Sequence, residues 1–238
     1  GRIKGDTQAG YALALAFDLV QGKKAKLAAK YLVEDIEKRD WHLSTGFIGT
    51  KYLMLVLSKI GRPDVAYRLL HNDTFPSWGF SIKQGATSIW ERWDGWTPEQ
   101  GFQDAGMNSF AHYSFGAVYQ WMVGNIGGIR SAGPAFKQII LAPQPDPQMA
   151  SAAVGYRSIR GLIATDWKQQ DGRLICHLSI PANTTAQVIL PASGAAAVTE
   201  GGRPLDKVSG VQFLRQDGAN VILSVGSGGY TFAVNRAR

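Results

Sequence analysis

The densest group of chemically capable side chains lies in the stretch Ile89-Trp90-Glu91-Arg92-Trp93-Asp94-Gly95-Trp96, a short way after Trp78. A carboxylate among indoles suits a sugar, because flat aromatic faces pack on the apolar face of a sugar ring while acids and bases act on its glycosidic oxygen. The alternative is that Trp90 and Trp93 belong to the hydrophobic core and that Glu91 pairs with a nearby cation. The stretch by itself leaves both interpretations open.

Other ionisable residues are expected to have mainly structural roles. Asp94, Glu99 and Asp104 are in the same region, and each by itself is typical of a turn or a cap. His112 stands among aromatic residues, where a histidine belongs either to a packed core or to a site. The remaining histidines are scattered, at positions His42, His71 and His177. No metal-binding spacing is present, and we predict neither a metal nor a cofactor.

Composition restricts the class of protein further. The 238 residues are 45% hydrophobic and 11% aromatic, which favours a folded chain over disorder. The net charge is +7, but the basic residues are scattered, so we predict no nucleic-acid partner. Residues 11–20 form the longest apolar run, which is too short to cross a bilayer, so we predict no membrane partner. The single cysteine, Cys176, excludes an internal disulfide framework.

The elements that must position these residues change character along the chain. In the first half, apolar residues recur at helical spacing. This spacing predicts a helix that begins at Asp6 or Thr7 and ends before Gly22, and further helices over residues 23–39, 48–60, 63–71 and 108–123. Residues 72–107, which include Glu91, lack the periodicity and are predicted to form a long functional loop.

After Gly127-Gly128, short alternating runs replace the helical pattern. They predict strands over residues 136–141, 159–167, 174–180, 186–190, 211–214, 221–225 and 230–234. Several short strands at a spacing of roughly ten residues are typical of a β-sandwich. We therefore predict an α+β chain of two domains, with helices in residues 1–127 and an antiparallel β-sandwich in residues 128–238.

Four segments of the first half form a recognisable series: Thr45-Gly46-Phe47-Ile48-Gly49-Thr50, Pro76-Ser77-Trp78-Gly79-Phe80, the stretch from Thr87 to Gly95, and Asn108-Ser109-Phe110-Ala111-His112-Tyr113. Their order and spacing resemble the bacterial α-L-rhamnosidases, a family of glycoside hydrolases. The resemblance continues through residues 134–137, 158–161 and 180–186, so it covers nearly the whole chain. Its most specific part is the stretch from Thr87 to Gly95.

The resemblance implies a partial (α/α)6 toroid followed by a C-terminal β-sandwich, and removal of terminal α-L-rhamnose with inversion. It makes Glu91 the general base that activates water and His112 a residue that contacts the sugar. The indoles expected near the ring are those of Trp78, Trp90 and Trp93. The expected partners are rhamnose-containing glycosides or oligosaccharides. A bacterial cytoplasmic and a periplasmic location both fit a soluble chain in which no signal peptide is visible.

The sequence departs from the family pattern before Glu91. In the family, the general acid lies in a segment rich in Asp, Arg and Glu far upstream of the base, and no such segment precedes Glu91 here. We therefore expect the C-terminal part of such an enzyme, nearly inactive by itself, with self-association or a missing N-terminal portion covering an open toroid. The alternative is a non-catalytic carbohydrate-binding or structural remnant. Phe80 stands where the family often has tyrosine, so one hydroxyl contact is expected to be missing.

Overall fold

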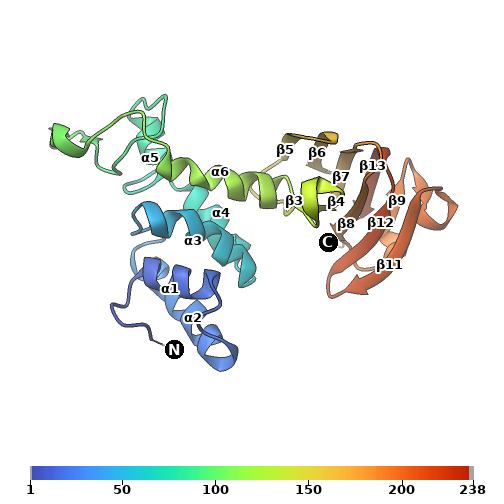
Figure 1. Ribbon diagram of the computed structural model, residues 1–238, viewed down its shortest axis with the longest axis horizontal. Coiled ribbons are helices and arrows are strands. Elements are labelled where there is room, and N and C mark those ends of the chain that lie inside the picture. Colours follow the sequence, from blue (N-terminus) through green and yellow to red (C-terminus); the bar gives the residue numbers. More distant parts are fainter. Residues whose placement is uncertain (1, 236–238) are drawn as a thin grey trace. The chain divides into compact units, whose positions relative to one another are not determined.

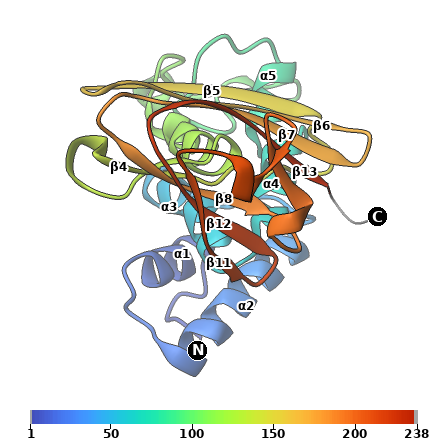
Figure 2. The ribbon, with the colours of Figure 1, turned by 90° about the vertical axis from the view of Figure 1, so that its right-hand side faces the viewer.

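The computed structural model describes residues 2–235, which form two compact units. The first unit is mainly helical and ends at Trp121, and the second begins at Met122 and is built mainly of β-strands. Figure 1 shows the helices in blue to green and most of the strands in yellow to red, and Figure 2 gives a second view of the sheets. The predicted succession of helices and then strands, an α+β chain, is confirmed.

Of the four longer helices of the first unit, three agree closely with those predicted from apolar spacing. The first is predicted to extend almost to Gly22 but stops at Ala16, because the chain leaves the helical conformation before Asp18, whose φ is +53°. The four helices are α1 (Gln8–Ala16), α2 (Gly22–Lys38), α3 (Phe47–Lys59) and α4 (Pro63–His71). Thr7 caps α1, because its hydroxyl accepts a hydrogen bond from the N–H of Gly10 at 3.1 Å. Pro63 occupies the first turn of α4, where the missing N–H of proline breaks no helical hydrogen bond.

These helices pack on one another in sequence order. α1 contacts α2 and α3, and α3 contacts α4. Their interface is filled by buried apolar side chains, namely Tyr11, Leu15, Leu32, Ile36, Leu53, Leu57, Val65 and Leu69. α1 and α3 approach most tightly at Gly49, where an added Cβ would lie 2.8 Å from the Cβ of Ala9. This core holds the loop between α2 and α3, which forms one wall of the candidate site.

The region predicted as a long loop contains short regular elements. They are the helix α5 (Trp78–Lys83), the hairpin of β1 (Trp96–Thr97) and β2 (Gly101–Phe102), and the single turn η1 (Ala105–Met107). α5 begins after Ser77, whose hydroxyl accepts the N–H of Phe80 at 2.9 Å. These elements escape prediction because none is long enough to show a periodic pattern.

The prediction of a helix over residues 108–123 is wrong at its beginning. Helical structure starts only with η2 (Ser114–Ala117) and continues through α6 (Val118–Trp121) and the wide turn η3 (Met122–Ile126). The preceding residues pair with another segment instead: the N–H of Glu91 donates to the carbonyl of Ser109, and the N–H of His112 donates to the carbonyl of Ile89, both at 2.8 Å. His112 therefore lies in a loop, before the helix.

Two sheets form most of the second unit within the described residues. The first has the strand order β10-β9-β13-β7-β6-β5 and the second β11-β12-β8-β4-β3. Their bounds are β3 (Ile129–Ser131), β4 (Gln138–Leu141), β5 (Ser151–Ser158), β6 (Gly161–Gln170), β7 (Arg173–Ile180), β8 (Thr185–Pro191), β9 (Val198–Glu200), β10 (Arg203–Pro204), β11 (Val211–Asp217), β12 (Asn220–Val225) and β13 (Gly228–Asn235). The short turns η4 (Pro134–Phe136), η5 (Ala195–Ala197) and η6 (Leu205–Lys207) connect them.

Alternating side chains of both sheets form the core of the second unit, among them Trp167, Cys176, Val188, Leu223 and Phe232. The indole N–H of Trp167 donates to the carbonyl of Ile126 at 2.7 Å, which ties β6 to the segment that leads into β3. One neighbouring pair departs from the predicted antiparallel sandwich, because β4 and β8 pair in parallel. Parallel neighbours need a long crossover, and here the chain between them passes through β5, β6 and β7 of the other sheet.

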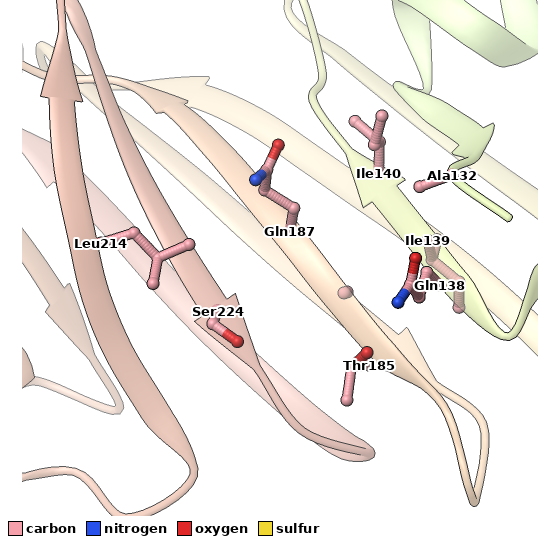
Figure 3. A pocket seen from close by; sticks show the side chains of 9 residues that line it. Ala132, Gln138, Ile139, Ile140, Thr185, Gln187, Leu214 and Ser224 are labelled. Carbon is pink, nitrogen blue, oxygen red and sulfur yellow. The ribbon is translucent and has the colours of Figure 1, made fainter.

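The outer side of the second sheet carries an open pocket of about 280 Å³ (Figure 3). It is lined by uncharged residues of β4, β8, β11 and β12, including Gln138, Ile140, Gln187, Leu214 and Ser224. Along β8 the side chains alternate between this outer surface and the core, so Gln187 faces the pocket while Val188 is fully buried. The pocket is thus a hollow of the sheet surface, and the buried residues Ile139 and Ala186 form part of its lining.

Candidate active site

Glu91 lies between α5 and β1, and its main chain and side chain both bond to Ser109. The N–H of Glu91 donates to the carbonyl of Ser109 at 2.8 Å, and the N–H of Ser109 donates to Glu91 Oε2 at 2.7 Å. The side chain retains 17% of its exposure, so the carboxylate is sheltered but open to small molecules. One carboxylate oxygen is therefore held in place, while Oε1 is directed elsewhere.

His112 presents a defined ring nitrogen to that second oxygen. The N–H of Ser114 donates to Nδ1 of His112 at 3.3 Å, so Nδ1 is an acceptor and the proton of the neutral ring is on Nε2. Nε2 is 3.9 Å from Glu91 Oε1. The ring is stacked between Phe47, with centroids 4.7 Å apart, and Tyr113, with centroids 5.3 Å apart. This stacking restricts rotation of the imidazole and keeps Nε2 beside the carboxylate.

Trp93 belongs to the wall of the site. Its indole N–H donates to the carbonyl of Thr45 at 2.9 Å, and its ring stacks on Phe115 with centroids 3.9 Å apart. Trp78 supports this pair from behind: it meets Trp93 edge to face and donates its indole N–H to the carbonyl of Phe115 at 3.0 Å. Trp93 is half-buried, whereas Trp78 is buried.

Trp90 points away from this wall. It is buried, and its ring meets Phe110 edge to face at 5.0 Å. The core interpretation therefore fits Trp78 and Trp90 in this structure, while Trp93 is the indole that lines the open pocket. Contact of any of the three indoles with a sugar stays a prediction.

An open pocket of about 500 Å³ lies directly beside Glu91. Its lining comes from the loop between α2 and α3, the segment before α5, the stretch around Glu91 and two later residues: Leu43, Ser44, Thr45, Gly46, Phe47, Phe75, Pro76, Glu91, Arg92, Trp93, Asp94, Met107 and Phe115. Most of these side chains are apolar, and the charged ones are consecutive or nearly so in sequence. The pocket thus combines an aromatic wall with one charged edge.

The charged edge includes an ion pair. Arg92 Nε and Nη2 donate to the two carboxylate oxygens of Asp94 at 2.9 and 3.0 Å. The hydrogen bonds from Arg92 hold the pKa of Asp94 below its usual range, and those same bonds raise the pKa of Arg92. Asp94 is therefore ionised near neutral pH and is a poor proton donor.

The other ionisable residues singled out in the sequence lie outside this pocket. Asp104 caps η1 by accepting the N–H of Gly106 at 2.8 Å, as expected of a capping residue, and Glu99 is exposed. His42 bonds to Arg39 and Thr74, and His177 bonds to Thr231. Within residues 2–235, no group of three or more His, Cys, Asp and Glu side chains is arranged to hold a metal ion. The same range contains no helix with the length and apolar character needed to cross a bilayer.

Sequence reasoning missed the residues that orient the site. Phe47, Phe115 and Ser109 contact the candidate residues directly, and Thr45 accepts the hydrogen bond of Trp93. Phe47 and Thr45 lie in the first segment of the series that resembles the rhamnosidases, so the motif contained them without indicating their partners. Contacts between residues 45 and 93 arise only when the helices pack.

A helical unit that presents a carboxylate, a histidine and an aromatic wall, joined to a two-sheet domain, has the features of a helical-hairpin glycoside hydrolase. Residues 1–126 match the family model of the bacterial alpha-L-rhamnosidase 6 hairpin glycosidase domain. Residues 128–203 match that of the bacterial alpha-L-rhamnosidase C-terminal domain. The chain belongs to the bacterial alpha-L-rhamnosidase family.

Several proteins that are similar to this chain are named alpha-L-rhamnosidases. The chain is 44% identical to an alpha-L-rhamnosidase of Streptomyces avermitilis over 98% of its length, and 35% identical to one of Formosa agariphila over 95%. A crystal structure of the Streptomyces avermitilis alpha-L-rhamnosidase complexed with L-rhamnose matches 98% of the chain with a TM-score of 0.92 and 43% identity. The chain spans only 22% of that solved chain, and 22% and 24% of the two relatives.

Proposed function

We propose that this chain provides the general-base part of an inverting α-L-rhamnosidase. Glu91 Oε1 removes a proton from water, which attacks the anomeric carbon of a terminal α-L-rhamnose on the side opposite the leaving group. The observation that carries this proposal is the geometry of Glu91: Oε2 accepts the N–H of Ser109, and Oε1 stands 3.9 Å from His112 Nε2 at the edge of an aromatic pocket.

His112 and Trp93 orient the sugar in this proposal. With its proton on Nε2, His112 donates a hydrogen bond to a sugar hydroxyl that lies between the imidazole and Glu91. Trp93 offers an apolar ring face, held in place by Thr45 and Phe115. Trp78 supports this wall from behind, and Trp90 packs on Phe110; neither is proposed to contact the ring.

The general acid of the proposed reaction is outside these 238 residues. An inverting site separates acid and base carboxyls by about 6.5–9.5 Å, to leave room for the attacking water. Asp94 is the other carboxylate that lines the pocket, and its bond to Arg92 keeps it ionised and therefore unable to donate a proton. The relatives are four to five times as long as the matched part, which leaves ample sequence for an acid.

The proposal is tested by hydrolysis of an aryl α-L-rhamnoside at high protein concentration, because an aryl leaving group departs with little help from an acid. Three proteins are compared: the chain as given, Glu91→Gln, and Glu99→Gln, a matched loss of an exposed carboxylate from the same region. We expect slow release of the aryl alcohol that disappears only in Glu91→Gln, with the β-anomer of rhamnose as first product. Equal rates in all three proteins would overturn the role of Glu91.

A second function is binding of a rhamnose-containing sugar without hydrolysis. The pairing of Asp94 with Arg92 favours it, because Asp94, the carboxylate that lines the pocket beside Glu91 among the described residues, is then held ionised and is a poor acid. Titration of tryptophan fluorescence with L-rhamnose separates the two functions: binding that Glu91→Gln retains, without product in any variant, supports the second.

The remaining expectations about partners stay predictions. Large apolar side chains are exposed on the helical unit, with Leu19 at 73%, Ile48 at 69% and Ile82 at 67%. Such surfaces favour association, either with a second copy or with a further part of a longer enzyme. Neither a nucleic-acid nor a membrane partner is proposed.

A further inference from the structure

The hairpin that follows Glu91 is closed at its base by one amide side chain. Asn108 Nδ2 donates to the carbonyl of Gly95 at 2.9 Å and to that of Gln103 at 3.4 Å, on either side of β1 and β2. The N–H of Gln103 also donates to the carbonyl of Gly95 at 3.2 Å. Asn108 thus joins the end of the Glu91 segment to the returning strand.

The orientation of this amide is defined by what surrounds it. Asn108 Oδ1 is buried and has no hydrogen-bond partner among the described residues. Reversing the amide would satisfy nothing, because it would place Oδ1 against two carbonyl oxygens. Gly95 provides the necessary space, since a Cβ at this position would lie 2.8 Å from Oδ1.

The next residue carries both bonds that hold Glu91. Ser109 accepts the main-chain N–H of Glu91 and donates its own N–H to Glu91 Oε2. We propose that Asn108 is a positioning residue: by fixing the hairpin base to the chain immediately before Ser109, it places the Ser109 N–H on Oε2 and leaves Oε1 to act on water. This inference rests on the proposed role of Glu91 as base.

The ¹⁵N–¹H resonance of Ser109 reports this bond without any need for turnover. In Glu91→Gln we expect the Ser109 amide proton to move upfield from its position in the chain as given, because an amide oxygen is a weaker hydrogen-bond acceptor than a carboxylate. In the Asn108→Ala background this change at Ser109 is expected to be at least about twofold smaller, while the amides of α1, α2, α3 and α4 keep their positions. A change at Ser109 of undiminished size in the Asn108→Ala background overturns the inference.

If Asn108→Ala does not fold, a second variant tests the same inference. Gly95→Ala pushes on Oδ1 from the opposite side and is expected to weaken the Ser109 response in the same way. The matched control is Gln100→Ala, which removes the bond that Gln103 donates to Gln100 at the exposed end of the same hairpin. Loss of the Ser109 response in this control, to the same degree, would show a general loosening of the hairpin and contradict the assignment to Asn108.

Steady-state kinetics of Asn108→Ala on the aryl rhamnoside test whether Asn108 positions the base. Misplacement of the base lowers kcat, by about tenfold, and leaves KM within about twofold. A variant that raises KM alone would assign Asn108 to sugar binding and overturn positioning of the base. Absence of Glu91-dependent turnover in the unaltered chain would refute the proposed function, yet the Ser109 resonance would still decide whether Asn108 holds this bond.

Discussion

The segment around Glu91 and the sheets of the second unit are held together in different ways. In the sheets, neighbouring strands pair along continuous ladders, as β6 does with β7 from Ala164 to Gln170. Around Glu91, main-chain pairing is short and individual side chains add further bonds: Asn108 binds Gly95 and Trp93 binds Thr45. A strand ladder contains many similar main-chain hydrogen bonds, whereas the side-chain hydrogen bonds near Glu91 are individual bonds that differ in donor and acceptor.

This difference predicts where function and stability separate. When one contact in a sheet is lost, the many remaining ladder bonds keep the strands in place. Mutations there therefore change mainly the free energy of unfolding. The site depends on individual side-chain contacts, so we expect mutations there to change geometry and activity before they change the free energy of unfolding. Variants of the two regions are expected to show this separation, with the largest effect at Glu91 and the smallest at the Arg92–Asp94 pair.

Glu91→Gln is expected to lower turnover of an aryl α-L-rhamnoside by about 10²–10⁴-fold, because the amide cannot take a proton from water. The amide oxygen still accepts the N–H of Ser109, so the fold is retained. Rate measurement together with far-UV circular dichroism checks both parts. If activity and the helical circular-dichroism signal fell together, the loss of activity would reflect unfolding. That result would contradict the separation of function from stability.

Leu223→Ala is expected to lower the free energy of unfolding by about 2–5 kcal/mol, because Leu223 is fully buried in the core of the second unit. Urea unfolding followed by circular dichroism measures the change. Leu214→Ala, at a residue of the neighbouring strand β11 that is 42% exposed, is the control and should change stability by less than about 1 kcal/mol. Similar losses in both variants would show that burial does not decide stability here.

Trp93→Phe is expected to weaken L-rhamnose binding by about three- to tenfold, since phenylalanine keeps an aromatic face but loses the hydrogen bond to Thr45. Isothermal calorimetry gives the affinity. Trp96→Phe serves as the control, because Trp96 is absent from the pocket lining. Unchanged affinity in Trp93→Phe would remove Trp93 from the sugar contact.

The smallest effect is expected from the Arg92–Asp94 pair. The pKa of Asp94 is lowered in the folded state, so its stabilising contribution is complete above the ordinary carboxyl pKa of 3.8 and is lost as the pH falls through the lower folded value. The stability difference between the chain and Arg92→Gln should therefore be present at neutral pH and shrink in this acidic range. Urea midpoints at several pH values measure it, and a difference that grows toward acid would contradict the pairing.

The sequence predicted the elements whose signal is local. α2, α3 and α4 follow from apolar spacing, and a cap at Asp6 or Thr7 follows from residue type, of which the structure selects Thr7. β6, β7 and β12 follow from alternation. β5 was missed, although Ala152, Val154 and Tyr156 alternate along it, because small residues and Gly155 weaken the pattern at the edge of a sheet.

Predictions that depended on distant pairing were less successful. Residues 108–113 have a composition compatible with a helix, but pairing with Ile89 and Glu91 takes their main-chain groups. The parallel pairing of β4 with β8 has no local signal, since it arises from the route of the chain through the other sheet.

The sequence by itself determined the α+β order, the family and the candidates Glu91 and His112, because residue types and short-range spacing are sufficient for these. Only the tertiary structure decided which oxygen of Glu91 faces His112, that Trp93 rather than Trp78 or Trp90 lines the pocket, and that Asp94 is bound to Arg92. These features depend on distances between segments up to 48 residues apart, as between Trp93 and Thr45, which packing alone brings within reach.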